Sequence, residues 1–237
     1  MPRMLDLFCG RWGWSKAFAA RGWECVGVDL KEPDHIPERC RFVQANIKML
    51  FYGYYGFEVA RSHANEVLGE FDFVCASSPC EKFSVFGMLH FHPNPAYPAE
   101  GIELFNFTRG LCEYAGVRYV MENVRGAQLF VGPPMNNCGP FYLWGNAVPP
   151  LMPQNIRKGM VMGESKLVNE LKRNGDREAI KAYRRKFDLT WNSSKSPERR
   201  EATARAATIP PELANCVADY AERLLEQCGL SGAPACL

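Results

Sequence analysis

A cysteine that follows a short apolar run is the residue of this chain best placed for covalent chemistry. The run 71–78 (FDFVCASS) leads through Pro79 to Cys80. A turn rich in backbone N–H groups, beside Lys82, would lower the pKa of this thiol and keep it accessible as a nucleophile. Such a thiol can activate an electron-poor ring by adding to it. The alternative is a buried, inert thiol, which we expect of Cys75 inside the run.

A glutamate at the end of a second apolar run is a candidate partner for this thiol. The run 117–124 (VRYVMENV) indicates a buried strand that ends in Glu122 and Asn123. A carboxylate there costs free energy unless it is paired or used, and burial would let it share a proton near neutral pH. The alternative is a carboxylate that only accepts hydrogen bonds from nearby backbone N–H groups.

The first 30 residues predict a strand–helix–strand unit. The apolar run 4–9 indicates a buried strand, and residues 24–30 indicate a second one. Between them, residues 15–21 indicate a helix with Ser15 as its cap. A unit of this kind places the turn after its first strand at the sheet edge where α/β proteins bind ligands.

Glycines and an acid in this unit predict a nucleoside cofactor. Gly10 and Gly13 allow a tight turn and a close approach of the backbone to a ligand. Asp29 ends the second strand, where its carboxylate can accept hydrogen bonds from ribose hydroxyls. Both NAD and S-adenosylmethionine (SAM) suit this arrangement, but the bulk of Trp12 leaves less room for a pyrophosphate. A unit without any ligand is the alternative.

The remaining pattern alternates strands with helices. Residues 99–115 and 211–226 indicate helices, and residues 51–56 and 90–98 indicate loops. The alternation predicts an α/β fold with a mostly parallel sheet covered by helices on both faces.

The composition is that of a globular protein. The chain has 237 residues, 47% apolar and 23% charged, with a net charge of +2. It has no apolar run of about 18 residues and no secretory signal pattern, so we expect a cytoplasmic protein without a membrane span.

The ten cysteines include no Cys-x-x-Cys, so we expect reduced thiols and no metal site. Residues 166–205 hold 12 Lys/Arg and 6 Asp/Glu, which suggests a polyanionic partner or else a solvated helical face.

Four ordered motifs together resemble those of the DNA cytosine-5 methyltransferases. LDLFCGRWGW (5–14) resembles their SAM loop, SSPCEKFS (77–84) their Pro-Cys motif and MENV (121–124) their Glu-Asn-Val motif. ATIPPELANCVADY (207–220) resembles their final motif, which packs beside the first. The resemblance implies a Rossmann-like, SAM-dependent methyltransferase fold with a much reduced target-recognition region. The compact form is similar to phage-encoded members, which implies a prokaryotic or phage-infected cell.

The resemblance also implies a role for individual residues. In this family the cysteine attacks C6 of a cytosine that has left the DNA stack, and the glutamate contacts N3 and the exocyclic amine. The implied catalytic residues are Cys80, Glu122, Arg157 and Asn123. The implied cofactor-binding residues are Phe8, Gly10, Arg11, Trp12, Gly13, Asp29, Leu30, Asn46, Ile47 and Pro79. The implied nucleic-acid-binding residues are Lys82, Ser84, Arg173, Arg184 and Arg185.

The sequence departs from the family pattern at several positions. Trp12 replaces a glycine of the first motif, Asn46 an aspartate that would bind the adenine amine, and Glu81 a glutamine. The Gln-x-Arg-x-Arg motif is reduced to QNIRK, in which only Arg157 matches. GNAVPP (145–150) has the letters of the final motif but comes too early, so we expect a loop there.

The expected organisation is a discontinuous SAM-binding domain with a small insert. The domain would comprise 1–158 and 201–228, the basic insert 159–200 and a flexible tail 229–237. An insert of this size can contact phosphates but offers little surface for base reading, so we expect short, relaxed or partner-supplied specificity. Double-stranded DNA is the expected partner, with RNA possible, and the expected state is a monomer.

Other functions fit part of the same pattern. An RNA cytosine-5 methyltransferase would use the same motifs. Two cations near a sulfonium, Arg11 and Lys82, would suit a carboxylated SAM analogue and carboxymethyl transfer, unless they face solvent, phosphate or the methionine carboxylate. A catalytically silent nucleic-acid-binding module has no need for both Cys80 and Glu122, and a NAD-dependent oxidoreductase leaves that pair unexplained.

Overall fold

The computed structural model describes residues 1–52, 65–87, 89, 93–153, 173–179, 208–227 and 229. The chain divides into two units, Met1–Ile156 with Ile209–Leu237, and Arg157–Thr208. In the second unit, the described segment 173–179 is largely exposed and turns at Gly175, whose φ is +68°. The insert at 159–200 and the tail at 229–237 stay predictions, because most of their residues lie outside the described part.

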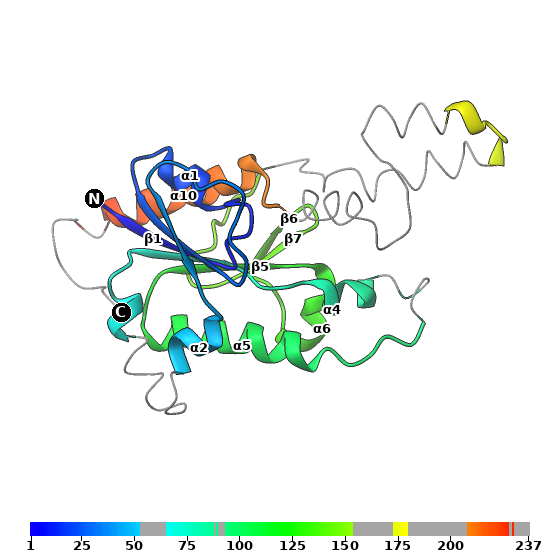
Figure 1. Ribbon diagram of the computed structural model, residues 1–237, viewed down its shortest axis with the longest axis horizontal. Helices are drawn as coiled ribbons and strands as arrows, with labels where there is room; N and C mark the ends of the chain where they lie inside the picture. Colours follow the sequence, from blue (N-terminus) through cyan, green and yellow to red (C-terminus); the bar gives the residue numbers. More distant parts are fainter. Residues whose placement is uncertain are drawn as a thin grey trace. The chain divides into compact units, whose positions relative to one another are not determined.

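A seven-stranded sheet forms the centre of the first unit (Figure 1). Its strands are β1 (Arg3–Leu7), β2 (Glu24–Asp29), β3 (Cys40–Gln44), β4 (Phe73–Ser77), β5 (Tyr119–Asn123), β6 (Asn136–Cys138) and β7 (Phe141–Trp144). They lie in the order β3-β2-β1-β4-β5-β7-β6. The first five of these pair in parallel, and β7 runs antiparallel to both of its neighbours. The predicted α/β fold with a mostly parallel sheet is confirmed.

Helices cover both faces of the sheet, as Figure 1 shows. On one face, α1 (Ser15–Ala19) and α10 (Pro211–Gln227) pack on Met4 and its neighbours. On the other face, α2 (Ile47–Tyr52) and α5 (Ala99–Tyr114) pack on Leu5 and Leu7. Successive strand residues point to opposite faces, so each buried strand supplies both cores. No helix among the described residues is long and apolar enough to cross a membrane.

Short elements follow the strands at the carboxyl edge of the sheet. After β4 come α4 (Glu81–Ser84) and the 3-10 turn η1 (Val85–Gly87). After β5 come the 3-10 turn η2 (Arg125–Ala127) and α6 (Gln128–Val131). The strand order reverses between β1 and β4, and open α/β sheets bind ligands beyond the carboxyl ends of the strands at such a reversal. The loops after β1 and β4 therefore border the expected ligand crevice.

Two local predictions need correction. Residues 51 and 52 belong to α2, whereas the sequence predicted a loop from residue 51. Ser15 does not cap α1: the cap position is Trp14, and the Ser15 hydroxyl donates to a strand carboxylate instead. The loop predicted at 145–150 is confirmed, and Asn146 accepts a hydrogen bond from the Tyr119 N–H at the start of β5. This loop therefore lies at the opposite sheet edge from the Pro-Cys motif.

Candidate active site

The loop after β1 is held in a shape that few side chains adopt. Phe8, Gly10 and Trp12 all have positive φ angles, of 62°, 45° and 61°. The Gly10 N–H donates to Oδ2 of Asp29 over 3.0 Å, so the end of β2 fixes the loop at the end of β1. Bulky residues rarely occupy the left-handed region, and such strain concentrates at functional sites. The loop therefore keeps a backbone conformation that Phe8 and Trp12 do not favour, and the contact from Asp29 helps to hold it there.

The indole of Trp12 lies inside the protein and not in the mouth of the loop. Its side chain is 1% exposed and meets Phe42 edge-to-face at 6.2 Å between ring centroids. Gly27 on β2 provides the space, because a Cβ there would lie 2.2 Å from Trp12 Cζ3 and 2.5 Å from Cη2. Trp12 and Gly27 therefore form a matched pair: the large residue in the loop requires the missing side chain on the strand.

Substituting Gly27→Ala should destabilise the fold by about 1 to 3 kcal/mol, because the buried Trp12 ring cannot move away without repacking. The cost should shrink in a Trp12→Phe background, which removes the outer ring atoms. Chemical denaturation of the four proteins of this cycle measures the coupling. Gly110→Ala is the matched control, because a Cβ at Gly110 meets nothing within 4 Å. Equal costs in both backgrounds would contradict the pairing.

The final motif packs directly against the first. A Cβ on Gly13 would lie 2.9 Å from Cβ of Ile209, just before α10. Arg21, beyond α1, donates to Oδ1 of Asn215 on α10 over 2.7 Å and also pairs with Asp219. These contacts close one side of the cofactor loop with residues almost 200 positions later, as the resemblance implies.

A buried aspartate that the sequence analysis missed lies beneath this loop. Asp6, on β1, is 0% exposed, and its Oδ2 accepts hydrogen bonds from the Ser15 hydroxyl (2.6 Å) and the Ser15 N–H (3.2 Å). Its Oδ1 has no partner among the described residues. Burial raises the pKa of Asp6 to about 7. Asp6 was predictable as a site residue, because an acid within the apolar run MLDLF (4–8) is costly to bury unless it is paired or used, as argued for Glu122.

The pKa of Asp6 makes stability depend on pH. The folded-state value near 7 exceeds the reference value of 3.8, so the folded chain takes up a proton between them. The stability that this proton provides is complete below about pH 4 and is lost as the pH rises to about 7. Asp6→Asn cannot ionise, so its stability relative to the native chain should rise by about 2 to 3 kcal/mol between pH 5 and pH 8. Denaturation curves across this range test the prediction, and parallel pH profiles would contradict it.

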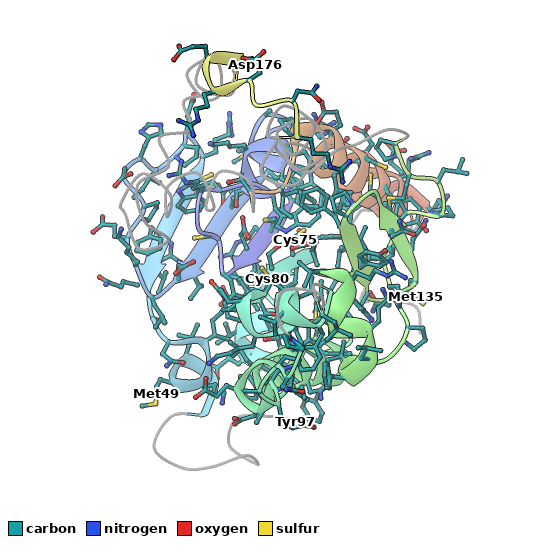
Figure 2. All side chains as sticks on the ribbon, turned by 90° about the vertical axis from the view of Figure 1, so that its right-hand side faces the viewer. Met49, Cys75, Cys80, Tyr97, Met135 and Asp176 are labelled. Atoms are coloured by element: carbon teal, nitrogen blue, oxygen red, sulfur yellow. The ribbon has the colours of Figure 1, made fainter. Side chains whose placement is uncertain are left out.

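The Pro-Cys turn places Cys80 at the start of α4. Cys80 is half-buried, whereas Cys75 on β4 is fully buried, as expected; Figure 2 labels both cysteines. The Cys80 carbonyl accepts hydrogen bonds from the N–H groups of Phe83 (3.0 Å) and Ser84 (2.9 Å), and from the Ser84 hydroxyl (2.9 Å). The backbone around the thiol is therefore fixed by the first turn of the helix.

The end of β5 anchors this turn. Asn123 is 0% exposed, and its Nδ2 donates to both the carbonyl and the hydroxyl of Ser78, each over 3.0 Å. Glu122 precedes it, is 7% exposed, and is the register partner of Ser77 on β4. The buried amide thus ties the loop that carries Cys80 to the strand that carries Glu122. Both candidate catalytic residues lie at the carboxyl ends of neighbouring parallel strands.

A further hydrogen bond joins the cofactor loop to the Pro-Cys turn. The Trp14 indole N–H donates to the Ser77 hydroxyl over 2.9 Å. Ser77 is the last residue of β4 and lies three positions before Cys80. The two loops on either side of the strand-order reversal are therefore linked, and the candidate cofactor and nucleophile sites form one region.

The rim of the candidate cofactor loop contains both apolar and polar side chains. Leu30 directly follows Asp29 and is 66% exposed, which leaves an apolar surface beside the candidate ribose acid. Asn46 is exposed, but its Oδ1 accepts the Lys48 N–H over 3.0 Å at the start of α2. Ile47 is 3% exposed and packs in the core on the α5 face. An acid and an exposed apolar side chain thus lie next to one another at the end of β2.

The remaining implied site residues vary in their surroundings. Arg11 is half-buried and Pro79 is exposed. Lys82 is exposed, with its Nζ 4.0 Å from Oε2 of Glu100 on α5. Arg173 is exposed in the second unit. The implied residues Arg157, Arg184 and Arg185 lie outside the described residues. The QNIRK segment (154–158) lies outside them as well. No cluster of three or more potential metal-ligating side chains occurs within the described ranges.

Comparison with known proteins identifies the class to which this fold and site belong. The family model for the C-5 cytosine-specific DNA methylases matches residues 2–130, more than half of the chain. The protein belongs to this family, which confirms the resemblance drawn from its motifs. No curated protein matches the chain.

Solved structures give more distant similarities. A protein described as a DNA modification methyltransferase of an E. coli prophage is 18% identical, with a TM-score of 0.36 over 54% of this chain. The bifunctional kinase-methyltransferase WbdD is also 18% identical, with a TM-score of 0.26 over 51% of this chain. The chain spans 33% and 24% of the lengths of these two proteins.

Proposed function

We propose that this protein transfers a methyl group from SAM to C5 of a cytosine in DNA. The observation that carries the proposal is the buried Asn123 bridge. It holds the turn of Cys80 against the strand of Glu122, at the sheet edge where the Gly10 loop meets Asp29. Family membership supports the same chemistry. The target base must leave the duplex stack, because its C5 and C6 are otherwise out of reach.

The residues of this chain divide the chemistry between them. The Cys80 thiolate adds to C6 of the cytosine, while Glu122 holds the proton at N3, so electron density moves to C5. SAM, when bound, would supply an electrophilic methyl group to C5, with S-adenosylhomocysteine as the leaving group. Water then accepts the C5 proton, and the bond from Cys80 to C6 breaks to restore the thiolate. Arg157 is the proposed contact to O2 of the base. Asn123 acts by position, since its amide is occupied by Ser78.

Cofactor and nucleic-acid contacts complete the proposal. Asp29 would accept hydrogen bonds from the ribose, and the exposed Leu30 would pack on the adenine. The basic insert and Lys82 would contact phosphates and give salt-dependent, weakly sequence-specific binding. Double-stranded DNA is the proposed partner of a monomeric protein that acts in the cytoplasm of a prokaryotic or phage-infected cell. RNA is the alternative substrate that the test must include.

Plain methyl transfer is favoured over carboxymethyl transfer. The case for a carboxylated analogue needs uncompensated cations near the sulfonium, and Lys82 has Glu100 4.0 Å from its Nζ. One of the two cations therefore has an acidic neighbour already.

Mass spectrometry of nucleosides tests the proposal. The purified chain is incubated with double-stranded DNA or structured RNA, and with SAM or carboxylated SAM. We expect 5-methylcytosine in the DNA reaction with SAM. Product in RNA alone, or carboxymethylcytosine as the main product, would overturn the proposal in favour of the corresponding alternative. No product at all, with SAM binding demonstrated, would indicate a silent nucleic-acid-binding module.

A further inference from the structure

Two cysteines are paired across β2 and β3, and β2 ends at the candidate ribose acid Asp29. Cys25 on β2 and Cys40 on β3 are register partners in a parallel pair. Parallel neighbours lie about 4.8 Å apart and point their side chains to the same face. That separation falls within the roughly 4.4 to 6.8 Å between Cα atoms that a disulfide requires. The backbone therefore places the two Cα atoms at a disulfide's distance, and a small approach of the two Cβ atoms, which lie about a strand spacing apart, completes the geometry.

The two thiols interact with one another, and the interaction makes them chemically unequal. It raises the pKa of the Cys25 thiol and lowers the pKa of the Cys40 thiol. Lys16 on α1 also lowers the pKa of Cys40, while burial and Asp6 on β1 act in the opposite direction. Cys25 is 2% exposed, whereas Cys40 is half-buried. Cys40 is thus the more accessible thiol of the pair and the one whose surroundings favour the thiolate more.

Other cysteines of the described part have a different environment. Burial raises the pKa of the thiols of Cys9, Cys75, Cys112, Cys138 and Cys216. These are the properties of inert, structural thiols. In the β2–β3 pair, by contrast, a buried thiol with a raised pKa lies beside a half-buried thiol with a lowered pKa.

We infer that Cys25 and Cys40 form a reversible disulfide when the protein meets a hydroperoxide. The Cys40 thiolate attacks the peroxide O–O bond and becomes a sulfenic acid, and the peroxide leaves as an alcohol or as water. The Cys25 sulfur then attacks the Cys40 sulfur, which forms the S–S bond and releases the sulfenic oxygen as water. The two thiols lose two electrons and two protons in total. Any dithiol reductant reverses the reaction.

The bond would join the strands on which the candidate cofactor site rests. Asp29 and Gln44 are register partners four residues after Cys25 and Cys40, and Gln44 Nε2 donates to the Leu30 carbonyl over 3.0 Å. Cys25 Sγ also lies 3.6 Å from the carbonyl of Ser15, which binds Asp6. The inference concerns the thiols alone and stands whether or not the chain methylates DNA.

Peptide mapping of the full-length chain tests the inference. The reduced protein is treated with a few equivalents of hydrogen peroxide, blocked with an alkylating agent and cut by a Glu-specific protease. This enzyme cuts after Glu24 and Glu38 and so leaves Cys25 and Cys40 in different peptides. We expect the two peptides to be joined, with the mass of two hydrogens lost, and to separate on addition of dithiothreitol. Joined peptides from any other cysteine pair, or unlinked thiols after peroxide has oxidised other cysteines, would overturn the inference.

Variants separate the two roles. In Cys25→Ala, Cys40 should still react but stop at the sulfenic acid, which dimedone traps, and its alkylation should slow several-fold because the interaction between the thiols is lost. In Cys40→Ala, Cys25 should stay reduced. Cys216→Ala, a half-buried thiol on α10, is the matched control and should behave like the native chain. A Cys25→Ala protein whose Cys40 alkylates at the native rate, and forms no sulfenic acid, would contradict the assigned roles.

Discussion

Replacing Cys80 by serine is expected to lower methyl transfer to DNA by at least about 1,000-fold, with little change in SAM affinity or fold stability. The hydroxyl keeps the size of the thiol but is a far weaker nucleophile toward C6 of cytosine. Cys80 is half-buried at the start of α4. The hydrogen bonds that its carbonyl accepts from Phe83 and Ser84 do not depend on the side chain and remain possible in the serine variant. Single-turnover transfer of labelled methyl groups, together with calorimetric titration of SAM, measures both quantities.

Cys216→Ser is the matched control for this substitution, because Cys216 is also half-buried but lies on α10, where its Sγ contacts the Leu151 carbonyl. It should transfer methyl groups at nearly the native rate. If the Cys80→Ser enzyme kept more than about a tenth of the native rate, covalent catalysis by this thiol would be ruled out.

Glu122→Gln is expected to slow the chemical step by about 100- to 10,000-fold. Glutamine preserves the volume and one acceptor oxygen but cannot carry the proton that stabilises the ring at N3. Asn123 should keep the strand end in place, since its side chain is held by Ser78 and by the Val124 N–H. Single-turnover rates at saturating DNA separate this effect from weakened binding, and thermal unfolding confirms that the variant is folded.

A control on α5 distinguishes chemistry from charge. Glu100→Gln removes a carboxylate that is 87% exposed and lies 4.0 Å from Lys82. Its effect should be small and should depend on salt, because an exposed pair is screened. A loss of rate in Glu100→Gln comparable to that in Glu122→Gln would mean that net charge near the DNA, and not proton handling, is responsible.

Elements with strong local patterns were predictable from the sequence. The buried strands β1, β2, β4 and β5 read as apolar runs, and α5 and α10 as helical stripes. β3 (CRFVQ) was not predicted because it is an edge strand, half-exposed along its length, with polar residues at two of its five positions. The hairpin β6–β7 was not predicted because β6 is only three residues long, NNC. The position of β7 between β5 and β6 has no local signal at all, since it depends on pairing between distant segments.

The site shows the same division between local and tertiary information. A carboxyl-terminal position on a buried strand marked Cys80, Glu122 and Asp29, and the structure puts all three at one sheet edge. The contacts that hold the edge together were not predictable, because they join side chains far apart in sequence. The Trp14–Ser77 hydrogen bond spans 63 positions. The departure at Trp12 could be noticed but not understood until the facing strand position, Gly27, was known.

Covalent trapping is the most direct test of the claim that Cys80 attacks cytosine. An oligonucleotide duplex with 5-fluorocytosine blocks the final proton loss, so a covalent complex accumulates after methyl transfer. With SAM present, we expect a denaturation-resistant adduct whose peptide map places the DNA on Cys80, and no adduct with Cys80→Ser. An adduct that persists in Cys80→Ser, or the absence of one from a native chain that binds SAM and is offered both DNA and RNA, would contradict this claim.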